Sequence, residues 1–233
     1  MGEIFLIPTV LAENVVETIP TYVLAAVKKC VVVFAENERT TRRYFKLLDK
    51  TLVIDSFEWH TIHKAEETQL ATFKACITAG KNVAIVSEAG CPGIADPGQI
   101  LVRAAQEMHC KINVFVGPSA ILLALMASGL NGQQFEFVGY LPIEPNERVK
   151  KIKELESNSR KQSSTKIFIE TPYRNMQLFD AIINHCDPLT QCCIAVDITA
   201  STEKIITQSV KNWRLHQPAL HKRPAIFLLD ATV

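Results

Sequence analysis

The chain has 233 residues, of which 48% are hydrophobic and 21% charged, and its formal net charge is +1. These values are ordinary for a globular enzyme of one large or two smaller domains, and the near-neutral charge argues against a protein that coats nucleic acid. Seven cysteines without a CxxC pair are interpreted as reduced, mostly buried thiols of a cytoplasmic protein. The apolar runs predict neither a signal peptide nor a membrane span.

The first half of the chain alternates short apolar runs with helical patterns. Strands are expected over Ile4–Ile7, Val31–Ala35, Leu52–Ile54, Val83–Val86 and Ile112–Val116. Helices are expected over Val15–Lys29, from Glu36 onward, and over Ala65–Ala79, Gln99–Met108 and Ile121–Ser128. Strands and helices that alternate at this spacing indicate a βαβ domain with a mainly parallel sheet.

The second half has a different composition, because no glycine follows Gly139. Its expected strands are Phe135–Gly139, Lys166–Glu170, Cys192–Asp197 and Ala225–Leu229. The charged segment Glu144–Thr165 is interpreted as a solvated helix followed by a mobile linker. We therefore predict an α/β protein of two α/β domains, residues 1–117 with a mainly parallel sheet and residues 118–233 with a mixed sheet.

The loop at residues 86–98, VSEAGCPGIADPG, is the richest candidate for a ligand site. It follows a buried strand and contains three of the nine glycines together with the acids Glu88 and Asp96. Four other expected strand ends would meet it at the carboxyl edge of a sheet, namely Pro8–Thr9, Glu36–Arg39, Gly117–Ala120 and Glu170–Arg174. These residues alone predict a nucleoside-like ligand in a cleft between the domains. An ordinary strand-to-helix connection is the alternative.

The motifs of several common mechanisms are absent from the sequence. There is no Walker phosphate loop, no GxGxxG after the first strand, no HExxH and no GxSxG. His60 and His63 are three residues apart, but the sequence places no cysteine or third ligand near them. We therefore expect no metal site.

Five motifs, in the order of the family, make the chain resemble the tetrapyrrole-methylase-like superfamily of S-adenosylmethionine (SAM)-dependent methyltransferases. The family pattern VSDAGxPxxxDPG matches residues 86–98, with Glu88 in place of the aspartate. The patterns AEDTR, PGPxA, FxGFLP and FYESxxR are echoed at residues 35–39, 116–120, 137–142 and 168–174. Within the superfamily the chain is most similar to the small-subunit ribosomal RNA cytidine-2′-O-methyltransferase branch.

The chain departs from the family pattern at three further positions. Residues 10–19 replace the family's PIGNLxDIT without its glycine, and Asn37 replaces the aspartate of AEDTR. At residues 195–203 the arginine of the family's ARELTKxxE is lost. A side chain in place of a glycine narrows a turn that should be open to the ligand.

The resemblance implies a cytoplasmic homodimer, without membrane contact, that holds SAM in the cleft between its two domains and modifies ribosomal RNA or the small ribosomal subunit. It assigns cofactor binding to Pro8, Ser87, Glu88, Ala89, Gly90, Pro92, Ser119 and Ala120, and in the second domain to Ile169, Pro224 and Ala225. Methyl transfer is an in-line displacement that depends on alignment, and a carboxylate near a ribose hydroxyl would act as a base. The candidate bases are Glu36, Glu88 and Asp96, with Glu170 positioning the acceptor. Asp96 could instead cap the following helix.

Basic side chains beside the second motif are candidates for RNA contact. Most of four basic residues share one helix face by their spacing: Arg39, Arg42, Arg43 and Lys46. Weaker candidates are Arg174 and the lysines of residues 150–153. A solvated helix face is the alternative for this stripe. Three functions remain open: an RNA ribose methyltransferase, a methyltransferase for a tetrapyrrole or other small molecule, and a SAM-binding module that has lost catalysis.

Overall fold

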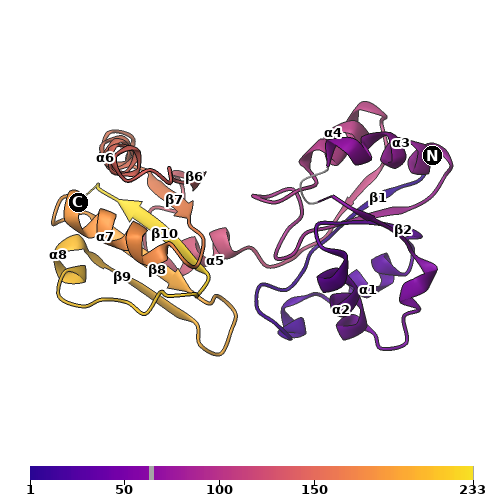
Figure 1. Cartoon of the computed structure of the whole chain (residues 1–233), viewed down its shortest axis with the longest axis horizontal. Helices are drawn as coiled ribbons and strands as arrows, with labels where there is room; N and C mark the ends of the chain where they lie inside the picture. The colour runs from indigo at the N-terminus through magenta and orange to yellow at the C-terminus, as the bar shows by residue number, and fades with distance from the viewer. Residues whose placement is uncertain (63–65, 233) are drawn as a thin grey trace. The chain divides into compact units, whose positions relative to one another are not determined.

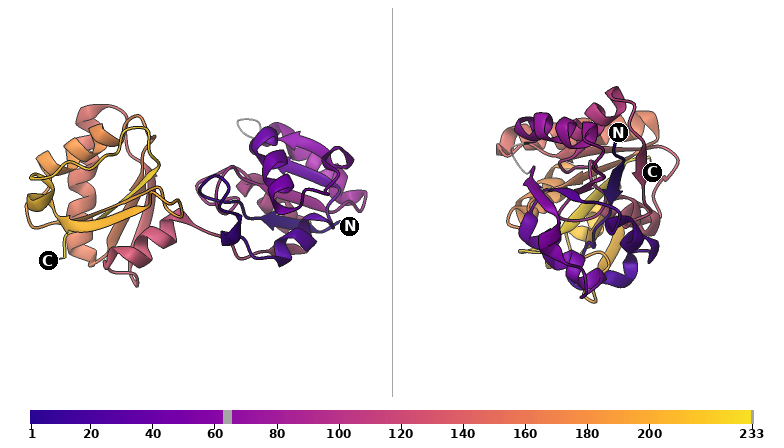
Figure 2. Two further views of the ribbon diagram at one scale, coloured as in Figure 1. Left: turned by 90° about the horizontal axis from the view of Figure 1, so that it is seen from below. Right: turned by 90° about the vertical axis from the view of Figure 1, so that its right-hand side faces the viewer.

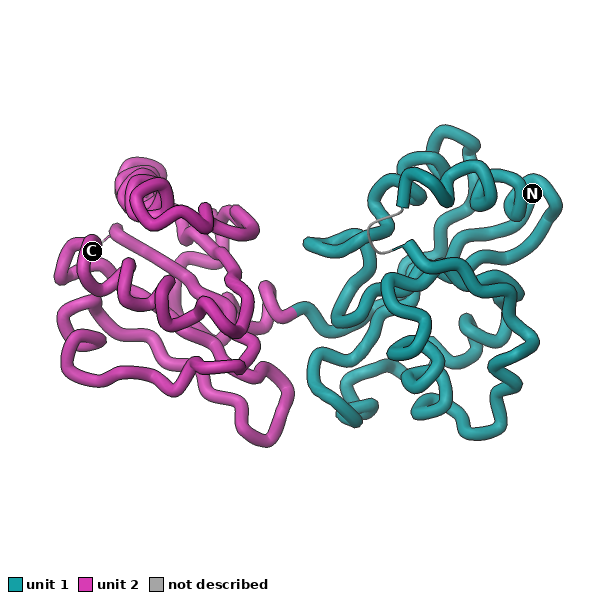
Figure 3. Tube along the Cα trace, viewed as in Figure 1, with its two compact units in different colours: residues 1–119 teal, residues 120–233 magenta. Residues whose placement is uncertain are grey.

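The structure, a computed structural model, describes residues 1–62 and 66–232 (Figure 1). The chain divides into two compact units, Met1–Ser119 and Ala120–Val233, which are described separately (Figure 3). No helix in the described part of the chain has the length and apolar character needed to cross a membrane. All seven cysteines are free thiols, and Cys91 is the one that is not buried.

Unit 1 is a parallel α/β sheet with the strand order β3-β2-β4-β1-β5. Its strands are β1 (Ile4–Ile7), β2 (Val32–Ala35), β3 (Glu58–Thr61), β4 (Val83–Val86) and β5 (Ile112–Val114). Its helices are α1 (Tyr22–Val27), α2 (Glu38–Leu48), α3 (Leu70–Thr78) and α4 (Gln99–Glu107), with 3-10 turns at Val16–Thr18, Ile54–Ser56 and Glu67–Gln69. The described strands of this sheet pair in parallel throughout, which confirms the predicted sheet type.

Helices cover both faces of this sheet, and the central strands are apolar on both sides for that reason. Figure 1 shows α3 and α4 on one face and α1 and α2 on the other. Along β2, Val33 packs into the core beneath α1 and α2, whereas Phe34 packs into the core beneath α3 and α4. Each fully buried side chain of this kind contributes about 1.5–3 kcal/mol to the free energy of folding. A continuous β-branched run is therefore what a central parallel strand requires.

Unit 2 contains a mixed sheet with the order β6-β7-β10-β8-β9. The strands are β6 (Phe135–Tyr140), β7 (Thr165–Ile169), β8 (Gln191–Val196), β9 (Lys204–Ser209) and β10 (Ala225–Asp230). The helices are α5 (Ala120–Ser128), α6 (Pro145–Gln162), α7 (Asn175–His185) and α8 (Val210–Trp213). Strands β6 and β7 are parallel, and the other neighbours are antiparallel. Figure 2 shows the ribbon of this unit from two further sides. The predicted fold class, two α/β domains with a parallel and a mixed sheet, is confirmed.

Two predicted elements of unit 1 are wrong. The expected strand Leu52–Ile54 is not a strand: a 3-10 turn begins at Ile54, and the third strand is β3. As an edge strand, β3 leaves its end residues exposed, so it lacks the continuous apolar run that identified the other strands. The first helix begins at Tyr22 and not at Val15, because Pro20 precedes it and provides the carbonyl to which the Val23 N–H donates.

One prediction in unit 2 also needs correction. The segment before β7 is not a mobile linker, because α6 continues to Gln162 and ends at Ser163 in the left-handed conformation. Arg160 and Lys161 in its last turn favour the helix, since cations stabilise the negative end of the helix dipole. Strand β9 of the same unit has no counterpart among the predicted strands.

In unit 1, the expected helix Ala65–Ala79 begins partly outside the described residues, and α3 itself spans Leu70–Thr78.

Candidate functional site

The loops after β1 and β4 are tied together at the carboxyl edge of the unit 1 sheet. The N–H of Thr9 donates to the Gly90 carbonyl at 2.8 Å, and the N–H of Gly90 donates back to Thr9 at 3.2 Å. The hydroxyl of Thr9 also donates to the Ser87 carbonyl at 3.3 Å. Since Ile7 and Val86 are register partners, the two loops leave the sheet side by side. The fold thus brings two of the predicted segments into direct contact.

Glycine is required at two positions of this edge. Gly90 has φ +71°, and a Cβ there would lie 3.2 Å from the Pro118 carbonyl oxygen and 3.3 Å from Leu11 Cδ2. A Cβ on Gly117 would lie 2.1 Å from Cβ of Pro8. Pro8 therefore packs directly on the backbone of Gly117, and the third predicted motif joins the first two.

The predicted cofactor residues of unit 1 differ in what they present to solvent. Pro8, Ser87, Gly90 and Pro92 are buried, and the Ser87 hydroxyl donates to the Ala89 carbonyl at 3.2 Å. Glu88 and Ala89 are exposed, so they are the members of the loop that a ligand would meet first. Ser119 ends unit 1 and Ala120 begins α5, and both are partly buried.

Two of the candidate carboxylates are held by hydrogen bonds between the loops after β2 and β4. The N–H of Glu88 donates to Oε2 of Glu36 at 2.9 Å. Oε1 of Glu88 accepts from Nδ2 of Asn37 at 3.0 Å and from the Thr40 hydroxyl at 3.4 Å. Asn37 also caps α2, because its Oδ1 accepts from the N–H groups of Arg39 and Thr40. An amide at position 37 can donate to Glu88, which an ionised aspartate cannot do.

Asp96 is the candidate acid with the most perturbed titration. Partial burial and, to a smaller extent, the nearby charges of Glu36 and Glu88 together raise its pKa to about 7. A carboxyl group that titrates near neutral pH is suited to general acid–base work. The three acids therefore form one electrostatically coupled cluster at the carboxyl edge of the sheet.

The alternative role for Asp96, as a helix cap, is wrong. Helix α4 has Gly98 at its cap position, and the carboxylate of Glu66 satisfies its first amides. Oε1 of Glu66 accepts from the N–H of Ile100 at 2.7 Å and from that of Leu101 at 3.1 Å. Sequence reasoning missed Glu66, because it lies far along the chain from the helix that it caps and belongs to no local capping pattern.

A pocket of about 290 Å³ opens between α2 and the loops after β1 and β4. Its wall combines apolar side chains with polar ones, and it is lined by residues 9–14, Thr40, Thr41, Arg43, Tyr44, Leu47 and residues 87–89. The Tyr44 hydroxyl donates to the Pro8 carbonyl at 2.7 Å, which holds α2 against the first loop. The pocket thus contains part of the predicted cofactor loop together with one predicted RNA contact, Arg43.

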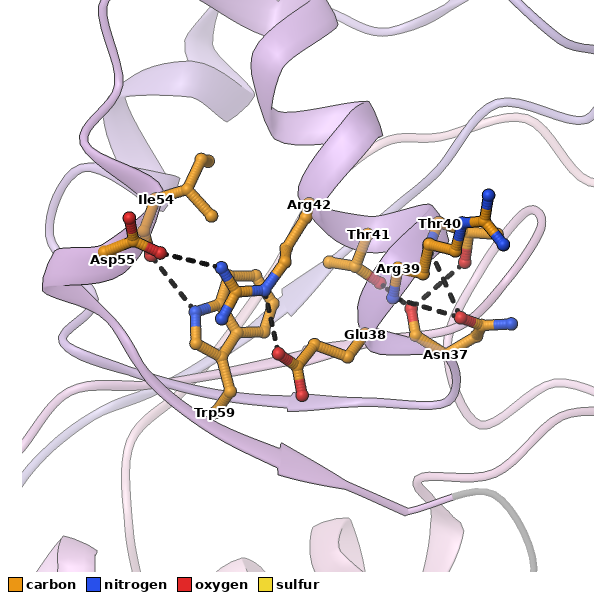
Figure 4. A network of polar contacts seen from close by, with 9 residues as sticks. All are labelled: Asn37, Glu38, Arg39, Thr40, Thr41, Arg42, Ile54, Asp55 and Trp59. Carbon is orange, nitrogen blue, oxygen red and sulfur yellow. Dashed lines mark hydrogen bonds and ion pairs between the residues drawn. The ribbon is translucent and has the colours of Figure 1, made fainter.

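On the predicted basic face of α2, three cations are exposed and one, Arg42, is paired with carboxylates. Arg39, Arg43 and Lys46 are exposed on the helix. Arg42 is drawn into the polar network of Figure 4, where its Nε lies 2.8 Å from Glu38 Oε1 and its Nη1 lies 2.9 Å from Asp55 Oδ1. Its guanidinium also lies 4.7 Å from the centre of the Trp59 ring. Arg42 is therefore engaged in two ion pairs and a cation–π contact within the protein.

The predicted residues of unit 2 gather at one edge of its own sheet. Arg174 donates to Oε1 of Glu170 from Nε at 3.0 Å and from Nη2 at 2.6 Å. The Glu170 side chain is buried, and its Oε2 has no hydrogen-bond partner within the described chain. Ile169 ends β7, Ala225 begins β10, and the Pro224 carbonyl accepts from the N–H of Asp197 at 3.0 Å. Arg174 is therefore a partner of Glu170 and only partly exposed.

Comparison with known proteins identifies the family. The model of the tetrapyrrole (corrin/porphyrin) methylases matches residues 17–213. The chain is 32% identical over 180 residues to the ribosomal RNA small subunit methyltransferase I of Synechocystis sp., a match that covers 75% of this chain and 59% of that protein. The chain thus spans about three fifths of the length of this relative and of a second one from Vibrio cholerae.

Solved structures share the fold. The methyltransferase CobJ superposes with a TM-score of 0.67 and 16% identity, over 99% of this chain and 94% of that one. Uroporphyrin-III C-methyltransferase from Thermus thermophilus, complexed with S-adenosylhomocysteine, superposes with a TM-score of 0.59 and 14% identity, over 99% of this chain and 98% of that one. At these identities the likeness concerns the fold alone.

Proposed function

The chain belongs to the tetrapyrrole (corrin/porphyrin) methylase family, and on this premise we propose that it is a SAM-dependent methyltransferase acting on a ribose 2′-hydroxyl of ribosomal RNA. The observation that carries the proposal is the acidic cluster of Glu36, Glu88 and Asp96 beside a pocket bordered by a basic helix. A ribose hydroxyl is a weak nucleophile, so its methylation needs a base close to the reacting oxygen. The sequence similarity to ribosomal RNA small subunit methyltransferase I supports the choice of acceptor.

The loop of residues 87–92 fits the cofactor. A Cβ at position 90 would press on Pro118 and Leu11, so only glycine lets the loop take this conformation beside the exposed Glu88 and Ala89. Exposed Glu88 offers carboxylate oxygens to ribose hydroxyls, which are good partners for a charge-assisted hydrogen bond. When bound, SAM supplies an electrophilic methyl carbon. The other predicted contacts with SAM are Pro8, Ser119, Ala120, Ile169, Pro224 and Ala225.

In the proposed reaction, Asp96 accepts the proton of the acceptor hydroxyl. Its pKa of about 7 leaves roughly half of the molecules with a carboxylate at neutral pH, which is the form that can take a proton. Burial first, and then the negative charge of Glu36 and Glu88 nearby, make Asp96 a stronger base than an ordinary aspartate. Glu170 is the proposed positioning residue of unit 2.

The pocket beside α2 fits one nucleotide of the acceptor. Val10, Leu11 and Leu47 give it apolar surface against which a base can lie, and Arg43 gives a cation at its wall for a phosphate. Exposed Arg39 and Lys46 extend this positive charge along α2. We further propose that the protein works in the cytoplasm as a homodimer, with the small ribosomal subunit as its partner.

A small-molecule acceptor such as a tetrapyrrole is the second candidate. It is favoured because Arg42 is paired with Glu38 and Asp55, so fewer cations of α2 are available to bind RNA than the sequence predicts. A SAM-binding module without catalysis is the third candidate, because Leu11 in the glycine-free first loop lies close to Gly90.

Two measurements separate these candidates. Calorimetry with SAM and with S-adenosylhomocysteine tests the shared premise, and absence of binding to both would remove all three functions. Incubation with labelled SAM and 30S subunits from a strain that lacks the gene then tests the acceptor. Label in the ribosomal RNA supports the proposal, and binding of SAM without transfer to RNA contradicts it. Gel filtration with light scattering tests the homodimer.

A further inference from the structure

A second cluster of functional side chains lies away from the carboxyl edge, between the edge strand β3 and helix α3. It consists of Glu58 and His60 on β3 and Cys76 on α3, and their potential ligand atoms all lie within 4.8 Å of one another. Oε1 of Glu58 is 2.9 Å from Nε2 of His60 and 3.9 Å from Sγ of Cys76. The proposed methyl transfer uses none of these three residues.

The spacing along β3 places Glu58 beside His60, and the fold adds Cys76. Glu58 and His60 are two residues apart on a strand, so their side chains share the face that α3 covers. Trp59 between them packs on the opposite face, in the core beneath α1 and α2. Cys76 then reaches the same point from the buried side of α3. The local sequence places no cysteine near His60, and the tertiary structure supplies Cys76.

The neighbours of the cluster hold its side chains in place. The His60 ring stacks on Phe34 with a centroid distance of 4.7 Å, which limits its rotation. Lys81 binds Oε2 of Glu58 at 2.5 Å and leaves Oε1 turned toward His60 and Cys76. Outer partners of this kind orient the ligands of metal sites. The cluster is also accessible, because 41% of the Glu58 side chain and 19% of the His60 side chain are exposed.

We propose that Glu58, His60 and Cys76 form a binding site for a zinc-type divalent cation that joins β3 to α3. One carboxylate oxygen, one imidazole nitrogen and one thiolate are a donor set that zinc accepts, and three protein ligands leave a fourth position for water. Tetrahedral zinc would place these donors about 3.3–3.6 Å apart, given metal–ligand bonds of about 2.0–2.3 Å. The Glu58–His60 and Glu58–Cys76 distances of 2.9 Å and 3.9 Å lie on either side of this range, and the His60–Cys76 pair, within 4.8 Å, would close to it by movement of the side chains.

Binding changes the protonation of two ligands. The Cys76 thiol loses its proton to solvent as the sulfur–metal bond forms. His60 must present the lone pair of Nε2 to the metal, so its remaining ring proton resides on Nδ1. The hydrogen bond between His60 and Glu58 is replaced by two bonds to the same cation. No redox change or further reactant is needed.

Cobalt(II) is the appropriate probe, since it occupies zinc sites and a cobalt–thiolate bond absorbs light by charge transfer. The full chain, without a polyhistidine tag, is titrated with Co²⁺ under reducing conditions and then with Zn²⁺ in competition. We expect one saturable site with a charge-transfer band in the native protein. Cys76→Ser should abolish the band, and His60→Gln should weaken binding about tenfold or more, since even outer partners of metal sites are worth about 10–100-fold.

The matched control is Cys110→Ser, which changes another buried cysteine of unit 1 outside the cluster and should bind Co²⁺ like the native protein. Circular dichroism checks that each variant is folded. If Cys76→Ser does not fold, Glu58→Gln is used in its place. Zn²⁺ should also raise the melting temperature of the native protein and of Cys110→Ser but not that of a folded ligand variant. No saturable Co²⁺ binding, or a band that survives in Cys76→Ser, would show that the cluster is only an ion pair with neighbours.

Discussion

The backbone N–H of Glu88 donates a hydrogen bond of 2.9 Å to the carboxylate of Glu36. This bond joins the loops after β2 and β4, which are separated along the chain by α2, β3, α3 and β4. It also keeps two carboxylates close to Asp96, whose pKa they raise together with burial. A chain with a net charge of only +1 thus concentrates negative charge at one edge of a sheet.

Asp96 should control the pH dependence of methyl transfer. The rate should rise as pH increases through about 7, because the carboxylate is the active form of the proposed base. Asp96→Asn should lower kcat about 10²–10⁴-fold and remove this pH dependence. The measurement is a pH–rate profile with labelled SAM, with Asp55→Asn as the control for loss of an exposed acid. An unchanged profile in Asp96→Asn would contradict the assignment.

The same pKa has a consequence for stability, with a definite sign. Asp96 binds its proton more tightly in the folded state than in the unfolded chain, so its contribution to stability declines as pH rises from about 4 to about 7. Urea denaturation of Asp96→Asn should show a weaker decline over this range than the native protein. Parallel curves for the two proteins would mean that Asp96 is not perturbed by the fold.

Gly90→Val should abolish SAM binding while the fold of the protein persists. The new Cβ would press on the Pro118 carbonyl and on Leu11, and a side chain at φ +71° is strained by about 1–2 kcal/mol. Gly80→Val is the matched control, because Gly80 has φ +78° but has open space around its Cβ position. Calorimetry with SAM should show loss of affinity in the first variant alone. Equal affinity in both variants would place the cofactor elsewhere.

Arg43→Ala should weaken RNA binding and lower the slope of log K against log salt by about 1, since one phosphate contact is lost. Arg43 is exposed and lines the pocket. Exposed Lys29 lies on no predicted contact face, so Lys29→Ala should leave the slope unchanged.

Arg42→Ala should lower the free energy of unfolding by about 1 kcal/mol and leave the salt slope unchanged, because it removes the contacts with Glu38, Asp55 and Trp59. A salt slope that responds to Arg42 alone would reverse these roles.

Glu66→Ala should destabilise the start of α4. The two amides that donate to Glu66 would lose their partner, which costs about 0.5–2 kcal/mol for the loss of an N-terminal cap. Hydrogen exchange at Ile100 and Leu101 should accelerate more than exchange in α3. Glu67→Ala is a neighbouring control outside this contact. Equal protection of Ile100 and Leu101 in both variants would show that Glu66 contributes nothing to the cap.

The sequence predicted the elements whose signal is local. Central strands such as β2 and β4 were recognised because both of their faces are buried and every residue is apolar. Strand β3 was missed because an edge strand buries too little to need such a run. The length of α6 was underestimated, because its serine-rich end resembles a linker although its basic last turn suits a helix C-terminus.

The sequence by itself determined the family, the fold class and the five motifs, since each depends on residues that are neighbours along the chain. Only the tertiary structure decided which side chains meet across it. It tied Thr9 to Gly90, gave the cap of α4 to Glu66, paired Arg42 with Asp55 and brought Cys76 to His60. Such contacts arise from the order of strands in a sheet and the packing of helices on its faces. Strand order and helix packing cannot be deduced from the local spacing of residues.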